Sequence, residues 1–107
     1  MHKNNGLTDL TDLMFSLRAE IRSAMDMFNA QNHEGAKESL NPIKNLLNKV
    51  TDKAKARNSK EFDALFEPLK LSVERWIDAV EKENKQAVME SFNIFMNEFP
   101  KPYGATL

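Results

Sequence analysis

The sequence predicts an all-α protein whose single domain, residues 1–107, folds as an antiparallel up-down-up-down four-helix bundle. Along four segments, apolar residues recur at alternating steps of four and three, which is the spacing of one buried stripe on a helix. The 107 residues include only three glycines and four prolines, a composition that suits helices better than sheets and turns. Residues 65–99 also repeat residues 13–47 at an offset of 52, with eight identities. The bundle is therefore expected to consist of two similar helical hairpins.

Two explanations of this repeat stay open. Any two helical hairpins of similar length match at their apolar positions, which alone would produce part of the similarity. Polar matches such as Asn32 with Asn84 and Asn45 with Asn97 are not required by an apolar stripe, and they favour duplication of one hairpin.

A pair of hairpins exchanged between two chains is the rival of a bundle formed by one chain.

Composition excludes several classes of protein. The apolar content of 41%, the charged content of 29% and the net charge of −1 fit a globular domain with one modest core, without a field that attracts nucleic acid or a membrane. The absence of cysteine excludes disulfides, thiolate metal sites and a cysteine nucleophile. No apolar run is long enough to span a membrane. Because the first ten residues lack an apolar signal core, we expect a cytoplasmic location, or a periplasmic one if a leader was removed.

The first helix is expected over about residues 8–31. Thr8 or Asp9 is its predicted cap, and Leu7 is placed to pack back on the helix as a hydrophobic staple. Its apolar stripe consists of Leu10, Met14, Leu17, Ile21, Ala24 and Phe28.

The second helix is expected over about residues 33–56, with Asn32 as its cap. Its stripe consists of Ala36, Leu40, Ile43, Leu47, Val50 and Ala54. Pro42 removes one backbone hydrogen bond and clashes with the carbonyl four residues earlier, so a kink is predicted near residues 38–41. In the alternative, Asn41 caps a new helix and Pro42 is its first residue. The kinked continuous helix is preferred because the stripe keeps its phase through the proline.

The third helix is expected over about residues 60–82, with Ser59 as its cap. Its stripe consists of Phe62, Phe66, Leu69, Val73, Trp76 and Val80. Pro68 is expected to kink or break this helix, in which case residues 62–67 form a separate short turn.

The fourth helix is expected over about residues 84–99, with Asn84 as its cap. Its stripe consists of Val88, Phe92, Phe95 and Phe99. Pro100 and Pro102 are expected to end it and to leave residues 100–107 as an irregular tail.

No catalytic, metal or cofactor site is predicted. His33 is expected to face solvent at a helix start, and no Glu-x-x-His pair of the helical di-iron proteins is present. The carboxylates fall on outer faces, where they do not form an acid–base pair around a cleft. The basic stretch 44–60 is interrupted by Asp52 and contains no aromatic residue for base stacking, so no nucleic-acid partner is expected.

A surplus of aromatic residues and methionine is the most unusual feature of the sequence. It concentrates in the fourth helix, and two further apolar residues, Phe15 and Ile94, fall off the predicted stripes. One interpretation is core filling. The other is a face for a partner helix or an apolar ligand, since methionine-rich surfaces adapt to shape. The predicted face consists of Phe15, Trp76, Met89, Phe92, Ile94, Phe95, Met96 and Phe99.

The stretch 69–99 resembles the small four-helix cytochromes of the b and c-prime type. The similarity lies in Asp78-Ala79-Val80, a short charged break, and Gln86-Ala87-Val88 at the start of the last helix. In that family a methionine near the start of the first helix and a histidine near the end of the last hold heme, or a Cys-x-x-Cys-His motif attaches it. Met14 matches the methionine, but no histidine follows His33 and no cysteine is present, so heme is not expected.

The function predicted from the sequence is therefore that of a non-enzymatic bundle acting through protein–protein contacts, as an adaptor, a chaperone-like protein or a homodimer. The alternative is a heme-free relative of the four-helix cytochromes that binds an apolar small molecule or cofactor in its core. A cavity lined by Phe66, Trp76, Phe92 and Phe95 would favour this alternative.

Overall fold

The protein is an antiparallel up-down-up-down four-helix bundle, as the sequence predicts. The structure, a computed structural model, describes the backbone of residues 6–107 and the side chains of residues 10–107. Within this part of the chain, every regular element is a helix. The elements are α1 (Gly6–Asn29), α2 (His33–Glu38), α3 (Leu40–Arg57), α4 (Lys60–Glu81), α5 (Lys85–Glu98) and α6 (Pro100–Ala105).

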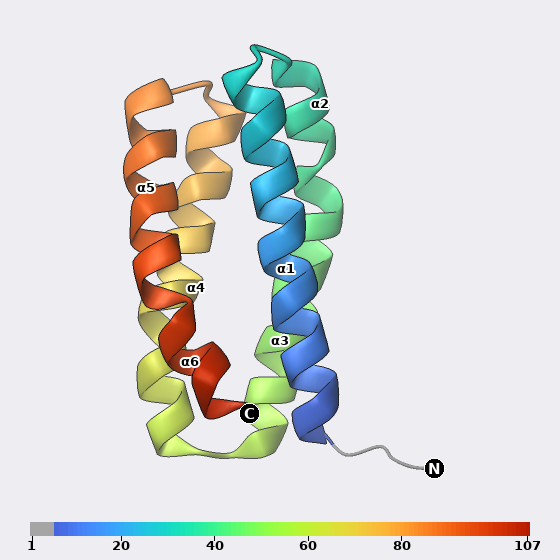
Figure 1. The fold of residues 1–107 in the computed structure, drawn as a ribbon, viewed down its shortest axis with the longest axis vertical. Coiled ribbons are helices and arrows are strands. Elements are labelled where there is room, and N and C mark those ends of the chain that lie inside the picture. The colour runs from blue at the N-terminus through green and yellow to red at the C-terminus, as the bar shows by residue number, and fades with distance from the viewer. Residues whose placement is uncertain (1–5) are drawn as a thin grey trace.

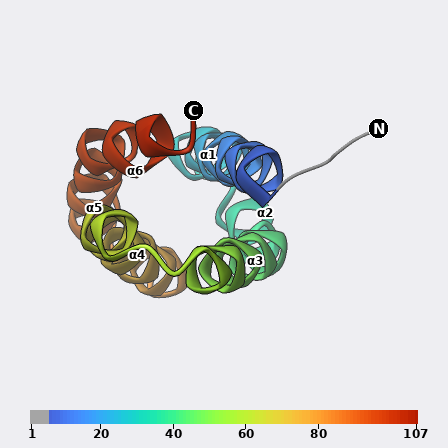
Figure 2. The same cartoon turned by 90° about the horizontal axis from the view of Figure 1, so that it is seen from below.

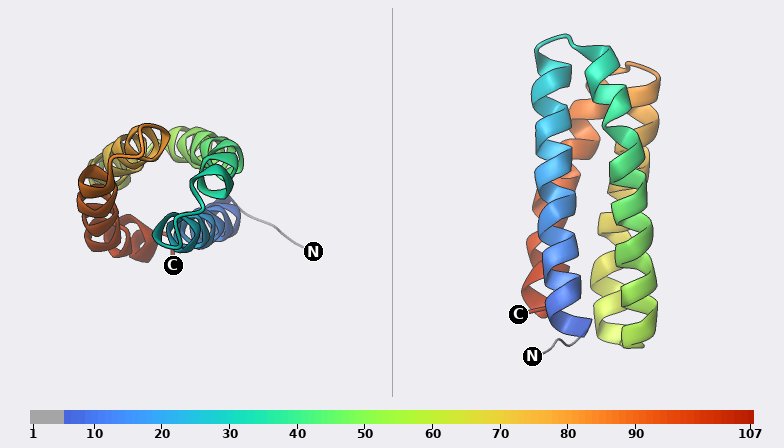
Figure 3. Two further views of the ribbon diagram at one scale, coloured as in Figure 1. Left: turned by 90° about the horizontal axis from the view of Figure 1, so that it is seen from above. Right: turned by 90° about the vertical axis from the view of Figure 1, so that its right-hand side faces the viewer.

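Four helical columns form the bundle, and chain neighbours are also neighbours in space (Figures 1 and 2). Helices α2 and α3 follow one another in a single column beside α1, and α5 lies beside α4 (Figure 3). The bundle measures 42 × 28 × 17 Å along its principal axes. Backbones approach most closely within the two hairpins, α1 with α3 and α4 with α5.

Helix α1 begins at Gly6, earlier than the sequence predicts. Thr8 and Asp9 therefore lie within its first turn instead of capping it, a correction of the size usual for helix ends. The predicted contact of Leu7 lies outside the described side chains.

Three predicted caps are confirmed. The Asn32 Oδ1 accepts a hydrogen bond from the Gly35 N–H at 3.0 Å, and the Asn84 Oδ1 accepts one from the Ala87 N–H at 3.2 Å. The Ser59 Oγ accepts the Phe62 N–H at 3.1 Å. Each cap satisfies a donor that the first turn of a helix leaves without a backbone partner.

The turns of the two hairpins have the same backbone geometry at an offset of 52 residues. Gln31 and Glu83 both adopt a left-handed conformation, with φ of 65° and 54°. The next N–H in each turn reaches back to the helix, from Asn32 to the Met27 carbonyl at 2.8 Å and from Asn84 to the Ala79 carbonyl at 3.0 Å. This is the Schellman ending of a helix. The repeat thus includes the helix ends as well as the apolar stripe.

An ion pair joins helix α2 to the turn of the second hairpin at one end of the bundle. The Lys37 ammonium donates a hydrogen bond to the Glu83 carboxylate. This hydrogen bond and the positive charge of Lys37 hold the pKa of Glu83 below its ordinary value. Both side chains are about two-fifths exposed, so the pair adds little stability in water.

Prolines explain the two interruptions inside the helical columns. The second column is divided at Ser39, three residues before Pro42, and the last column is divided at Phe99, three residues before Pro102. In each case a proline ring occupies the place of the N–H that would bond to the carbonyl four residues earlier. The first interruption lies in the segment where a kink was predicted, although it divides the predicted helix into α2 and α3.

The predicted irregular tail is wrong, because residues 100–105 form α6. Pro100 and Pro102 lie in the first turn of this helix, where an N–H has no intrahelical partner and a fixed φ favours the helical conformation. The Tyr103 N–H bonds to the Phe99 carbonyl at 3.1 Å. The prolines therefore interrupt the last column once and then begin a new helix.

Pro68 does not break the third predicted helix, although a break was one of the two predicted possibilities. Helix α4 continues through it from Lys60 to Glu81, so residues 62–67 are part of the long helix and do not form a separate turn. The Pro68 side chain is exposed, which leaves the buried stripe of α4 uninterrupted.

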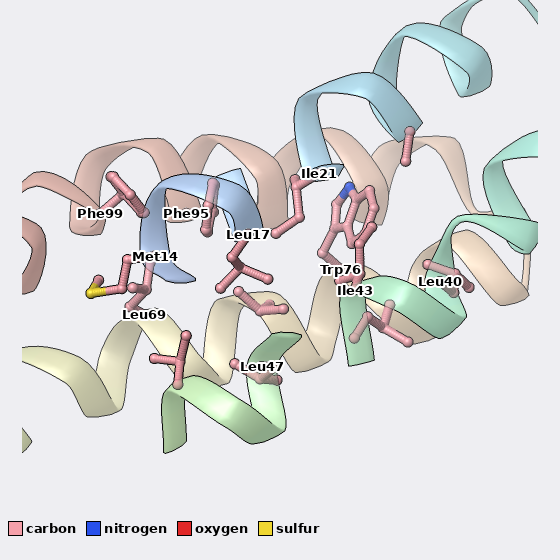
Figure 4. Packing of buried hydrophobic residues seen from close by; sticks show 14 of the residues in the cluster. Met14, Leu17, Ile21, Leu40, Ile43, Leu47, Leu69, Trp76, Phe95 and Phe99 are labelled. Carbon is pink, nitrogen blue, oxygen red and sulfur yellow. The ribbon is translucent and has the colours of Figure 1, made fainter. Parts of the chain in front are cut away.

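The core combines the apolar stripes of all four columns (Figure 4). Met14, Leu17 and Leu69 are completely buried. Trp76 of α4 is 1% exposed, and its Nε1–H donates to the Met25 sulfur of α1 at 3.1 Å. This contact joins the two hairpins across the interior.

Trp76→Ala should lower the free energy of unfolding by about 3–5 kcal/mol, because it leaves a large cavity where both hairpins meet. Urea denaturation followed by circular dichroism measures this loss. Leu71→Ala is the control, because Leu71 is 45% exposed on the same helix, and it should change stability by about 0.5 kcal/mol or less. Equal effects of the two substitutions would contradict the core described here.

Pro68→Ala should raise the free energy of unfolding by about 1–2 kcal/mol, less than the full helix penalty of proline because proline also restricts the unfolded chain. The substitution restores an N–H that can bond to the Ala64 carbonyl. The same denaturation measurement tests it. A loss of stability would mean that packing around α4 requires the proline.

Candidate interaction face

The structure separates the eight residues of the predicted face into two groups. Trp76, Phe95 and Phe99 are each 1% exposed and belong to the core, as the core-filling interpretation expects, so they are not part of an accessible face. The accessible group consists of Phe15, Met89 and Ile94, which are exposed, and of Phe92 and Met96, which are half-buried.

Helix geometry divides the accessible residues of α5 between two sides. Met89, Phe92 and Met96 follow one another at steps of three and four, so they form one stripe along the helix. Ile94 lies off this stripe, in a groove of about 320 Å³ between the outer sides of α4 and α5 that Arg75 and Glu90 also line. The structure therefore does not bring Ile94 together with the others.

Arg18 connects α1 to the aromatic residues of the last column. Its guanidinium carbon lies 4.9 Å from the centre of the Phe99 ring, 5.4 Å from that of Phe15 and 5.7 Å from that of Tyr103. A guanidinium over ring faces at these distances is held by cation–π attraction and by stacking. The half-exposed Phe15, with 52% of its surface accessible, is thereby attached to the edge of the core.

A continuous series of ring contacts follows from α6 into α5. The ring centres of Tyr103 and Phe99 are 5.0 Å apart, those of Phe99 and Phe95 are 5.5 Å apart, and those of Phe95 and Phe92 are 6.4 Å apart. These separations suit attractive contacts between rings. The series joins the buried phenylalanines to the partly accessible Phe92 and Tyr103.

We call the accessible part of this arrangement the seam face, because it lies along the seam between α1 and the last column. It consists of Phe15, Arg18, Met89, Phe92, Met96 and Tyr103.

The seam between α1 and α5 is the most loosely closed of the bundle. Among the described residues, the backbones of α1 and α5 make fewer close approaches than those of any other neighbouring columns. Large side chains span the gap between these backbones, as Arg18 does by lying over Phe99 and Tyr103. At the lower end α6 completes the closure, where the Thr11 hydroxyl of α1 bonds to the Thr106 hydroxyl at 2.7 Å.

Two members of the seam face, Arg18 and Tyr103, were not predicted from the sequence. Tyr103 was assigned to an irregular tail, which hid its position four residues after Phe99 on a helical stripe. That spacing was the available signal. Arg18 carries no comparable signal, because its position over three rings depends on the packing of α6 beside α1.

No known family matches this chain. No curated protein and no solved structure is significantly similar to it either. The resemblance to four-helix cytochromes therefore rests on the sequence features alone, and Met14, the residue that matched their methionine, is completely buried in the core.

The prediction that the His33 side chain faces solvent is wrong. This side chain is half-buried instead of facing solvent, and its ring packs edge-on against Phe28 with 4.8 Å between ring centres. Its Nδ1 atom is buried without a hydrogen-bond partner. Among the described residues, no three histidine or carboxylate side chains converge as metal ligands.

The remaining features of the surface are less specific. Lys44 of the basic stretch pairs with Glu81 at 3.3 Å, so part of its charge is balanced within the bundle. A groove of about 520 Å³ between α1 and α3 is lined by Asp12, Leu13 and Lys49 among others. No helix in the described part of the chain has the length and apolarity needed to cross a membrane.

Arg18→Gln and Tyr103→Leu should be coupled by about 0.5–1 kcal/mol in a double-mutant cycle of stability, because each removes one side of a cation–π contact. Urea denaturation of the two single variants and the double variant measures the coupling. Arg75→Gln combined with Tyr103→Leu is the control, and these effects should add. Additive effects in both cycles would exclude a contribution of the contact between Arg18 and Tyr103 to stability.

Proposed function

We propose that this chain is a non-enzymatic helical module that binds another protein through the seam face. The observation that carries the proposal is the partly accessible cluster of Phe15, Arg18 and Tyr103, together with the exposed Met89 of α5. Aromatic residues, methionine and arginine are the residues enriched in protein interfaces. Aromatic and arginine side chains also dominate the energetic centres of such interfaces.

The arrangement around the seam supports this use. Phe15 is 52% exposed and is not part of the core. Core packing therefore does not explain why a large aromatic side chain occurs at this position. Met89 and Met96 have flexible, polarizable side chains that can adjust to the surface of a partner. Met89 is exposed, whereas Met96 packs partly against the core.

The alternative function, binding of an apolar small molecule in the core, is less well supported. The rings that would line such a site contact other side chains of the bundle. Phe66 stacks on Phe62 with 5.8 Å between ring centres, and Trp76 donates to Met25. No specific observation along residues 10–107 favours a bound ligand over these contacts.

Affinity capture with matched variants tests the proposal. The wild type, a Phe15→Gln/Met89→Gln variant and a Leu71→Gln/Ile94→Gln control are immobilised, and proteins retained from a lysate of the source cells are quantified by mass spectrometry. The control removes two exposed apolar residues that lie off the seam face. All three proteins must first show the same circular dichroism spectrum.

A partner bound through the seam face should be retained by the wild type and the control, and its recovery should fall about tenfold or more with the seam variant. Equal retention by all three proteins would overturn the proposal. Loss confined to the Leu71→Gln/Ile94→Gln variant would also overturn it, because the binding surface would then lie on the outer side of α4 and α5.

A further inference from the structure

We infer that the partner of the seam face is an amphipathic helix that carries acidic residues beside its apolar stripe. This inference rests on the proposed function and adds the chemistry of the partner. It follows from the charges along α1, the apolar residues Met89, Phe92 and Met96 on the facing stripe of α5, and the kind of contact that helix surfaces offer.

The charged side of the seam lies on α1. Phe15, Arg18 and Arg22 follow one another at steps of three and four, so they share one stripe of the helix. Arg22 is exposed and Arg18 is half-buried. Two guanidinium groups on adjacent turns can each bind a carboxylate in a bidentate manner.

The other side of the seam is apolar. Met89, Phe92 and Met96 repeat the same steps along α5 and carry no charge. At the end of the seam near the hairpin turns, Asp26 follows Arg22 by one helical turn, and Lys85 begins α5. Among residues 10–107 on these stripes, Arg18, Arg22 and Lys85 are cationic, and Asp26 carries a carboxylate.

This distribution of charge disfavours a second copy of the chain as the occupant. In a two-fold symmetric contact through the seam face, the same patch meets itself. Arg18 and Arg22 of one copy would then approach those of the other, and like charges brought together in an interface cost free energy. A partner with carboxylates at these positions would instead be attracted and oriented.

A helix is the partner that this surface can accept. The seam face is built from side chains of helices, whose backbone N–H and C=O groups are already bonded within each helix. It offers no free edge to which an extended strand could add. A partner helix satisfies its own backbone and packs its side chains between those of the methionine and arginine stripes.

Three synthetic 18-residue peptides with one leucine stripe test the inference. They differ only at two positions next to that stripe, one turn apart, which are glutamate, glutamine or lysine. Each is titrated at low ionic strength into the ¹⁵N-labelled full chain, and amide shifts locate and quantify binding. Arg22→Gln is the test variant, because Arg22 is exposed. Arg75→Gln is the matched control, since Arg75 is exposed on the outer groove of α4 and α5.

The glutamate peptide should shift amides along the Phe15 and Met89 stripes and bind about fivefold more tightly than the glutamine peptide, as expected for two partly exposed charge pairs. The preference should shrink in Arg22→Gln, persist in Arg75→Gln and weaken as salt is added.

Equal binding of all three peptides along the seam would overturn the acidic partner and leave the proposed function standing. Tighter binding of the lysine peptide would overturn the acidic partner, because the seam would then favour positive charge. Shifts outside the seam, or none with any peptide, would overturn the helical partner, while the capture experiment would still decide the proposed function separately.

Discussion

The structure depends on one constraint, which is that each helical hairpin has an apolar face that only the other hairpin can cover. Burial of apolar surface is the main favourable term in folding, and a single hairpin has no second layer against which to bury its face. The contact of Trp76 with Met25 lies where the two faces meet. The backbones approach most closely within each hairpin, and large side chains between them fill the interior.

The two hairpins have equivalent turns and caps, and therefore present similar apolar faces to each other. Gln31 and Glu83 turn the chain with the same left-handed conformation, and Asn32 and Asn84 cap the following helices with the same hydrogen bond. Two hairpins with the same turn and the same stripe present similar faces to one another. The differences between them lie at the prolines, since Pro42 divides only the column of the first hairpin and Pro102 acts beyond the repeat.

The seam face is a consequence of how the bundle is closed. Three of the four boundaries between columns are formed by chain-connected neighbours, whereas α1 and the last column are joined only through space. Helix α6 helps to close that boundary, and Arg18 bridges it by lying over the rings of Phe15, Phe99 and Tyr103. The same boundary leaves Phe15 and Met89 accessible. The surface for which we propose a partner thus occurs where the chain itself provides the least closure.

The sequence by itself determined the helices, their caps and most of the core. Steps of four and three mark a buried stripe because they follow from the geometry of a single helix, and an asparagine or serine before such a stripe acts on the next few residues. These are local relations, which explains why Asn32, Ser59 and Asn84 were identified correctly. Of the candidate face, the sequence identified Phe15, Met89, Phe92 and Met96 as members.

Only the tertiary structure decided which of the apolar residues remain accessible. Phe95 and Phe99 share a stripe with Phe92, yet they are buried while Phe92 is only half-buried, because exposure depends on the distance to the neighbouring helix. The helical conformation of residues 100–105 placed Tyr103 over Arg18. Such contacts join residues far apart in the chain, and their geometry is set by packing between helices, which no local pattern encodes.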